Sequence, residues 1–238
     1  MTCCIGIKVK DGIVGLSDTR ITSGSEYINA SKTTIIQRPN HSMFIMTSGL
    51  RAARDKALTY FNEVLRTEDI HFSRLYVAVN AFAEQVRRVR TEDLNDLKEG
   101  GYNFDLTCII GGQLEEDKEH KLYMLYPEGN WVESSEDCSY YLIGETAFGK
   151  PIIQRTINYH SSLETALKIS FLAFDATRVA ARDVDYPIDI SLYRVNTFQF
   201  TQHRYEAQEL LPISTWWEST LELAIKRLPS DWTRLVLG

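Results

Sequence analysis

The chain has 238 residues, of which 44% are hydrophobic and 24% are charged. This is the composition of a folded globular protein with room for one large core or two small ones. The net charge of −6 argues against a protein that binds nucleic acid by neutralising phosphates. The sequence has no apolar run near the roughly 18 residues of a membrane helix, and it has no signal peptide pattern. We therefore expect a cytoplasmic protein with no membrane association.

The first half of the sequence changes its hydrophobic period once. Up to Gly49, apolar residues alternate with polar ones, which is typical of β-strands. After Gly49 the apolar residues recur at helical spacing in two successive segments. The expected strands cover residues 5–9, 12–18, 33–37 and 42–49, and the expected helices carry Ala53, Ala57, Phe61 and Val64, then Leu75, Val79, Phe82, Val86 and Val89.

The second half repeats this order of strands followed by helices. Strands are expected over 106–113, 121–126 and 138–144, a helix over 162–180 and a closing strand over 186–195. The order of strands, two helices, strands, two helices and a strand predicts an α+β fold, a four-layer αββα sandwich of two stacked sheets with helices outside. We expect one domain over 1–238, with a C-terminal helical extension from about residue 212.

The C-terminal extension has an amphipathic pattern. Its apolar positions fall on one helical face, and the pair Trp216 and Trp217 adds a large aromatic surface. This face either packs against its own domain or contacts another subunit. The apolar positions are Trp217, Leu221, Ala224, Ile225 and Leu228.

The four cysteines, Cys3, Cys4, Cys108 and Cys138, show no CxxC spacing and lie in apolar, strand-like segments. The pattern predicts buried, reduced thiols and neither a disulfide framework nor a metal site. The sequence also lacks a phosphate-binding glycine loop, so we expect no cofactor and no metal.

Thr2 is the residue with the clearest chemical potential. If Met1 is removed, Thr2 carries a hydroxyl and a free α-amine on neighbouring carbons, which can serve as nucleophile and base. Such an amine has a pKa of about 7.7 to 8.0, close to working pH. The segments "SDTR", "ASKTTII" and "TSGL" follow in that order. Each is a weak signal alone, and their order together with Thr2 is the informative feature.

This arrangement resembles the proteasome β-subunit family of N-terminal nucleophile hydrolases, and most closely its bacterial Anbu (ancestral β-subunit) branch. The resemblance covers nearly the whole chain, and "CIIGGQ", "YPEGNWVE" and "IGETAFGKPI" resemble the Anbu branch in particular. The matching site positions are Thr2, Asp18, Arg20, Lys32 and Gly49.

The roles of these residues also follow from elementary chemistry. A cationic Lys32 disfavours protonation of the Thr2 amine, and Asp18 keeps that lysine charged and oriented. A backbone N–H at Gly49 can stabilise the oxyanion that forms during acyl transfer. The expected catalytic set is therefore Thr2, Asp18, Lys32 and Gly49, to which the resemblance adds Arg20 and Asp183.

Two positions differ from the family pattern. In proteasome β-subunits, a Gly-Ser-Gly segment and an Asp-x-x-Ser segment support the N-terminal amine. Here Asp183 matches the aspartate, Tyr186 occupies the position of the serine that follows it, and Glu145 or Thr146 replaces the other serine. We expect an activity that is lower or differently tuned.

The resemblance implies a threonine endopeptidase that acts on peptides or unfolded proteins within a homo-oligomer, as a ring or an open helical ring. No feature of the sequence decides whether an unfoldase ATPase is a partner. The family match predicts that Ile21, Ala30, Thr47 and Arg51 line a specificity pocket, and their mixture of apolar and basic character selects no preferred side chain.

Two alternatives remain open at this point: a non-catalytic scaffold subunit and a small-molecule amidase, since N-terminal nucleophile folds also cleave small amides. A Cys3 nucleophile would require removal of Thr2 as well. A Ser-His-Asp hydrolase is disfavoured because no G-x-S-x-G segment is present.

Overall fold

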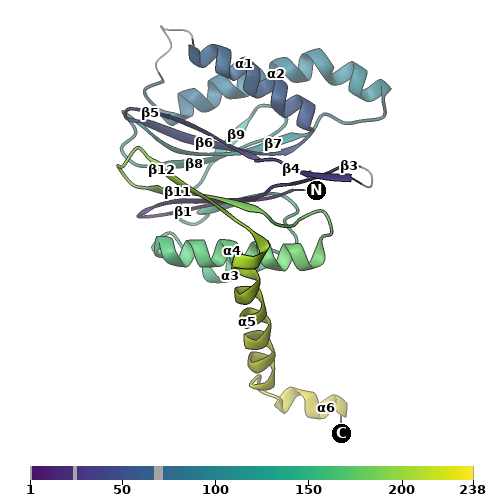
Figure 1. The fold of residues 1–238 in the computed structure, drawn as a ribbon. Coiled ribbons are helices and arrows are strands. Elements are labelled where there is room, and N and C mark those ends of the chain that lie inside the picture. The colour runs from purple at the N-terminus through teal and green to yellow at the C-terminus, as the bar shows by residue number, and fades with distance from the viewer. Residues whose placement is uncertain (1, 24–25, 67–71, 238) are drawn as a thin grey trace.

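The structure is a computed structural model that describes residues 2–23, 26–66 and 72–237. Two antiparallel sheets lie face to face, and helices cover the outer face of each (Figure 1). The first sheet has the strand order β10-β1-β2-β11-β12 and the second has the order β5-β6-β7-β8-β9. This is the four-layer αββα sandwich predicted from the sequence.

The strands and helices have the following bounds. The first sheet comprises β1 (Cys3–Val9), β2 (Gly12–Asp18), β10 (Tyr140–Gly144), β11 (Ile188–Arg194) and β12 (Phe200–Tyr205). The second comprises β5 (Thr33–Arg38), β6 (His41–Gly49), β7 (Leu106–Leu114), β8 (Lys121–Leu125) and β9 (Trp131–Glu133), and β3 (Arg20–Ser23) pairs with β4 (Glu26–Asn29) in a separate hairpin. The helices are α1 (Arg51–Arg66), α2 (Leu75–Glu99), α3 (Lys150–Thr156), α4 (Leu163–Ala180), α5 (Ala207–Lys226), the 3₁₀ turn η1 (Asp231–Thr233) and α6 (Arg234–Leu237).

Three apolar layers hold the sandwich together. One lies between the first sheet and α3 and α4, one lies between the two sheets, and one lies between the second sheet and α1 and α2. Strand β1 shows how the period of two creates them: Ile5 and Ile7 face the α4 layer, and Cys4 faces the other sheet. Both faces of each sheet are therefore buried, which explains the nearly continuous apolar character of β1, β2, β6 and β7.

The sequence pattern did not predict the hairpin β3–β4 or the strands β9 and β12. Strand β12 has the sequence FTQHRY and is largely exposed, so it carries no alternating apolar signal. It exists because its backbone pairs with β11, from Ile188 opposite Tyr205 to Tyr193 opposite Phe200. Backbone pairing between strands is invisible to hydrophobic periodicity.

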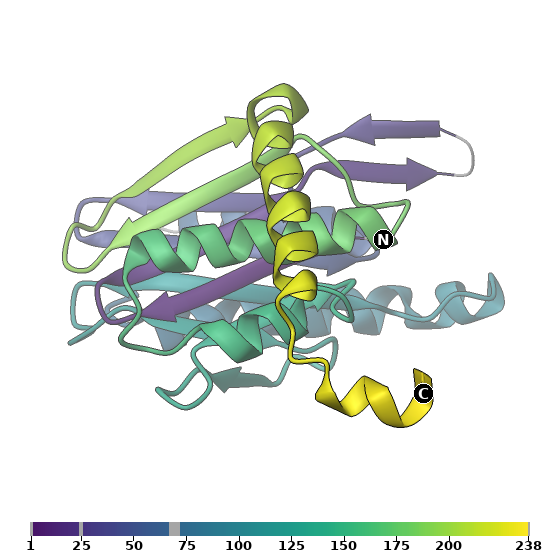
Figure 2. The same ribbon diagram turned by 90° about the horizontal axis from the view of Figure 1, so that it is seen from below.

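Helix α5 projects from the body of the molecule and crosses over α4 (Figures 1 and 2). Only Leu210 and Ser214 of this helix are buried. The expected start of the C-terminal extension, near residue 212, falls inside α5. No helix in the described ranges combines the length and apolar character needed to cross a membrane.

The cysteine prediction is correct for three positions and wrong for one. Cys3, Cys4 and Cys108 are buried and free, and burial raises the pKa of each thiol. Cys138 is exposed because it lies in the connection before β10, where no sheet face covers it.

Candidate active site

Thr2 lies at the start of β1, between two neighbouring strands. The Thr2 carbonyl accepts a hydrogen bond of 2.6 Å from the Glu145 N–H, directly after β10. Gly144 ends β10 with a φ of 84°, and a Cβ atom there would lie 1.9 Å from the Thr2 carbonyl oxygen. Only glycine permits this close approach, so Gly144 fixes the backbone of Thr2. The expected removal of Met1 concerns a residue outside the described ranges.

Asp18 and Lys32 form a buried ion pair behind Thr2. The Lys32 ammonium lies 2.7 Å from both oxygens of the Asp18 carboxylate. Asp18 is fully buried and also accepts a hydrogen bond of 2.8 Å from the Cys3 N–H. Burial raises the pKa of Asp18, and the Lys32 charge and the Cys3 N–H oppose that rise. The pair is therefore tied directly to the backbone next to Thr2.

Local hydrogen bonds explain how two distant segments supply this pair. Asp18 ends β2, and Lys32 directly precedes β5. The neighbouring hydroxyls of Ser17 and Thr33 lie 3.0 Å apart and join the two strand ends. This contact holds together the strand ends that carry Asp18 and Lys32, and so keeps the two charges paired. Separation of the pair would be costly, because it would leave a buried charge without a partner.

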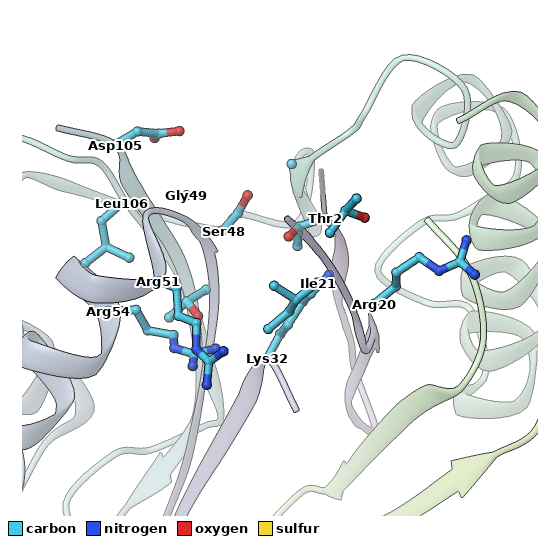
Figure 3. A pocket seen from close by; sticks show the side chains of 13 residues that line it. Thr2, Arg20, Ile21, Lys32, Ser48, Gly49, Arg51, Arg54, Asp105 and Leu106 are labelled. Atoms are coloured by element: carbon cyan, nitrogen blue, oxygen red, sulfur yellow. The ribbon is translucent and has the colours of Figure 1, made fainter. Parts of the chain in front are cut away.

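A cleft of about 360 Å³ opens at Thr2 (Figure 3). Gly49, where β6 ends, has a φ of 117°, and a Cβ atom there would lie 2.2 Å from the Asp105 carbonyl oxygen. The chain can therefore turn from β6 into α1 only with glycine at this position. The lining residues are Thr2, Arg20, Ile21, Thr22, Lys32, Thr47, Ser48, Gly49, Arg51, Arg54, Asp105, Leu106 and Gly144.

The cleft brings together four of the six expected catalytic residues: Thr2, Arg20, Lys32 and Gly49. Asp18 is not among the described residues that line it and contacts the cleft through Lys32. Of the expected specificity positions, Ile21, Thr47 and Arg51 line the cleft, and Ala30 is not among the described lining residues.

The guanidinium group of Arg20 is directed away from Lys32 (Figure 3). It lies 3.2 Å from the Asp185 carboxylate, donates a 3.2 Å hydrogen bond to the Arg182 carbonyl, and covers the Tyr27 ring at 4.5 Å. Arg20 thus anchors the segment between α4 and β11, to which Asp183 belongs. Asp183 is half-buried and lies outside the set of described cleft residues.

Comparison with known proteins agrees with this geometry. Residues 1–187 match the family described as "Proteasome subunit". The chain belongs to the proteasome subunit family. No curated protein matches the chain significantly.

Solved Anbu structures share this proteasome-subunit fold over almost the whole chain. An Anbu (Gly-1) mutant from Hyphomicrobium sp. strain MC1 has 28% identity and a TM-score of 0.88, covering 96% of this chain and 98% of its own. Anbu from Yersinia bercovieri has 24% identity and a TM-score of 0.87, with 95% and 98% covered. A helical assembly of the Anbu complex from Pseudomonas aeruginosa has 24% identity and a TM-score of 0.90, with 96% and 98% covered.

The two positions that depart from the proteasome pattern take up structural contacts. Tyr186 is buried in the α4 layer, where its ring packs edge-on against Phe174 at 5.2 Å and lies under the Arg178 guanidinium. Glu145 contacts Thr2 through its backbone N–H, and its side chain accepts from the Ala147 N–H at 3.2 Å. Neither side chain is among the described cleft residues.

Sequence reasoning missed six cleft residues of this proteasome-family protein: Thr22, Ser48, Arg54, Asp105, Leu106 and Gly144. For Arg54 a signal was available, since it follows Arg51 at a spacing of three on one helical face. Asp105 and Gly144 reach the cleft only because β7 pairs with β6 and β10 pairs with β1. No local sequence pattern predicts such pairings between strands.

Proposed function

We propose that this proteasome-family protein is a threonine peptidase whose nucleophile is Thr2, with Met1 removed. The observation that carries the proposal is the buried Asp18–Lys32 pair, in which Asp18 accepts a hydrogen bond from the Cys3 N–H and Lys32 lines the cleft together with Thr2. A buried ion pair is a poor source of stability, so its presence beside a candidate nucleophile points to a role in catalysis.

The mechanism is acyl transfer with the Thr2 amine as base. The amine accepts the hydroxyl proton as the hydroxyl oxygen attacks the substrate carbonyl carbon. The oxyanion accepts a hydrogen bond from the Gly49 N–H. Collapse breaks the C–N bond, and the amine returns the proton to the leaving nitrogen. Water then cleaves the Thr2 ester by the same route, which releases the acid product and restores the hydroxyl.

Lys32 and Asp18 prepare the amine for this reaction. The Lys32 charge disfavours protonation of the neighbouring amine, and the Asp18 carboxylate fixes the position of that charge with two contacts of 2.7 Å. Arg20 and Asp183 act at a distance, through the segment that Arg20 ties to the cleft by its contacts with Asp185 and the Arg182 carbonyl.

Intact mass spectrometry after exposure to a threonine-reactive peptide epoxyketone tests the proposal. We expect a protein that lacks Met1 and carries one inhibitor, and no adduct on Thr2→Ala. A protein that retains Met1 or stays unmodified would contradict the mechanism. Side-by-side assays with peptide and small-amide substrates separate a peptidase from an amidase, and inactivity on both would favour the scaffold alternative.

We also propose that the protein works as a homo-oligomer, in a ring or an open helical ring. Helix α5 and the turns after it expose large apolar side chains beyond the body of the molecule (Figure 1). Surfaces of this kind mark protein contacts, and the Pseudomonas relative is a helical assembly. The exposed side chains include Trp216, Leu223, Ile225, Leu228 and Trp232.

Light scattering tests the assembly. We expect a mass well above the 27.3 kDa of one chain at micromolar concentration, and a lower mass after deletion of the residues that follow Pro212. A monomeric full-length protein would refute the oligomer, and an unchanged mass after truncation would refute the role of the tail. We include a cytoplasmic location in the proposal, which the buried free thiols support because reduced cysteines persist in reducing compartments.

A further inference from the structure

We propose that the cleft selects substrates with an acidic side chain, glutamate or aspartate, on the residue whose carbonyl Thr2 attacks, and that Arg51 and Arg54 bind its carboxylate. This inference rests on the proposed peptidase function and adds the substrate class. The carboxylate of glutamate or aspartate is negatively charged and has two acceptor oxygens, so it can accept charge-assisted hydrogen bonds from two guanidinium groups and compensate their charge.

The two arginines face the same space. They occupy the first turn of α1, which starts immediately beyond Gly49, and their spacing of three puts them on one helical face. Both line the cleft, and in Figure 3 both extend from α1 towards Lys32. The Arg54 side chain is only 15% exposed, so its charge is partly removed from water.

Their charges are only half compensated. The Arg54 guanidinium lies 2.6 Å from the Asp55 carboxylate, and the Arg51 guanidinium lies 3.5 Å from the same carboxylate. One acidic side chain therefore serves two guanidinium groups. A bound substrate carboxylate would supply the second negative charge.

The other cations of the cleft have partners of their own. Lys32 is paired with Asp18, and Arg20 is paired with Asp185. Asp105 is the acidic residue among the described cleft residues, and its carboxyl group points away from the two arginines (Figure 3). The excess positive charge is thus concentrated at Arg51 and Arg54.

Helix polarity gives an independent reason for an anion here. The N-terminus of a helix carries a partial positive charge, so acidic residues are favoured in the first turn and basic residues are not. The first turn of α1 contains two arginines and no acidic residue. Placing them there costs stability unless an anion binds, and a substrate carboxylate would interact favourably with both the helix and the arginines.

The hydroxyl group of Thr47 gives another reason to expect a carboxylate ligand in the cleft. Thr47 lines the cleft at only 4% exposure, and its hydroxyl has no hydrogen-bond partner among the described residues. Buried hydroxyl groups are ordinarily paired. A substrate carboxylate would accept from this hydroxyl, and Ile21 and Leu106, which also line the cleft, would contact the methylene groups of the same side chain.

Hydrolysis of matched peptides tests the inference. Three fluorogenic tetrapeptides differ only in the residue before the cleaved amide, which is Glu, Gln or Leu. We expect kcat/KM for Glu to exceed that for Gln by about tenfold or more, and the double variant Arg51→Gln, Arg54→Gln to bring the ratio close to one. Arg66→Gln, at the far end of the same helix and exposed, is the matched control and should keep the ratio. Circular dichroism and thermal melts verify that each variant folds.

A binding measurement keeps the inference separate from the peptidase proposal. Calorimetry on full-length Thr2→Ala compares the binding of uncleaved Glu and Gln peptides. We expect Thr2→Ala to bind the Glu peptide about tenfold more tightly than the Gln peptide, and we expect this preference to disappear when Arg51→Gln and Arg54→Gln are added. Turnover of all peptides without a preference for Glu would overturn the acidic selectivity and leave the peptidase intact. Absence of any turnover would overturn the peptidase, and the calorimetry alone would then support or refute the acidic pocket.

Discussion

Two lysines near opposite ends of β1 show how two equally buried charges can differ in their partners. Lys32, near the Thr2 end, and Lys8, near the other end, are each 5% exposed. Lys32 makes two contacts of 2.7 Å with a fully buried carboxylate. Lys8 lies 3.5 Å from Glu119, whose side chain is 44% exposed, and 5.7 Å from the Tyr159 ring centre.

The buried charges of Lys8 and Lys32 are compensated in different ways. At Lys8 burial lowers the pKa of the ammonium, since the partly exposed Glu119 only partly offsets the loss of water and the Lys121 charge adds repulsion. Lys32 has a dedicated buried partner that is itself held by the Cys3 N–H. The degree of burial therefore does not separate the two lysines. A fixed partner and a place in the cleft beside Thr2 separate them, and these two features make Lys32 the candidate for the proposed catalytic role.

The nucleophile gives the largest expected effect. Thr2→Ala should reduce peptide hydrolysis by at least about a thousandfold, with fold and assembly intact, because the side chain is at a strand start and only half-buried. Thr2→Ser should keep partial activity, since hydroxyl and amine remain. Initial rates check both, with Thr201→Ala on the exposed strand β12 as control. Undiminished turnover in Thr2→Ala would refute the mechanism.

The comparison of the lysines is tested next. Lys32→Ala should be inactive and Lys32→Arg strongly impaired, since the bulkier, delocalised guanidinium does not fit the tight buried site that holds the compact ammonium. Lys8→Ala, at equal burial, should keep most activity. Lys32→Ala also leaves Asp18 unpaired and should lower the unfolding free energy by about 3–5 kcal/mol, so rates are compared well below each melting temperature. Normal rates in both Lys32 variants would show that the catalytic lysine is another residue.

Asp18→Asn should lose most activity, about a hundredfold or more, because general-base catalysis by the Thr2 amine would be impaired. The amide retains the shape of the carboxylate and can still accept from the Cys3 N–H, but it no longer compensates the Lys32 charge. The melting temperature, measured with kcat, separates this effect from unfolding. A fully active asparagine variant would mean that orientation of Lys32 does not need the negative charge.

The smallest effect is expected at Lys8. The pKa of Lys8 in the folded protein lies below its value of about 10.5 in the unfolded chain. At pH values between these two pKa values, the unfolded chain therefore binds more protons than the folded protein does. The Lys8 contribution to stability should therefore increase across that interval, while the buried thiols and phenols whose pKa is raised contribute in the opposite direction. Lys8→Met should remove the Lys8 contribution, so that the parent gains stability relative to the variant as pH rises, and at pH 7 it should lower the unfolding free energy by at most about 1 kcal/mol. Denaturant unfolding at several pH values measures this, and a strong loss of stability at pH 7 would show that Lys8 is well paired.

Much of the fold was predictable because most elements bury a periodic apolar face. The stripe Ala53, Ala57, Phe61 predicted α1, and the run from Leu75 to Val89 predicted α2. The segments that escaped prediction, β3, β4, β9 and β12, are short or polar and exist through backbone pairing. At the candidate site, Thr2, Lys32 and Gly49 were named from the sequence, and their roles stay predictions.

Local patterns in the chain were sufficient to predict the order of elements and the residue types able to perform acyl transfer, since periodicity and residue chemistry are local properties. They left the side-chain preference open, because Ile21, Thr47 and Arg51 are mixed in character. Which groups share the cleft depends instead on how the sheets and helices pack. Arg51 and Arg54 line one cleft with Thr2, and the Thr47 hydroxyl is left without a hydrogen-bond partner among the described residues, only after α1 and the strands of both sheets have packed together. Charge compensation and hydrogen-bond satisfaction depend on distances between residues remote in the chain, and folding alone sets those distances.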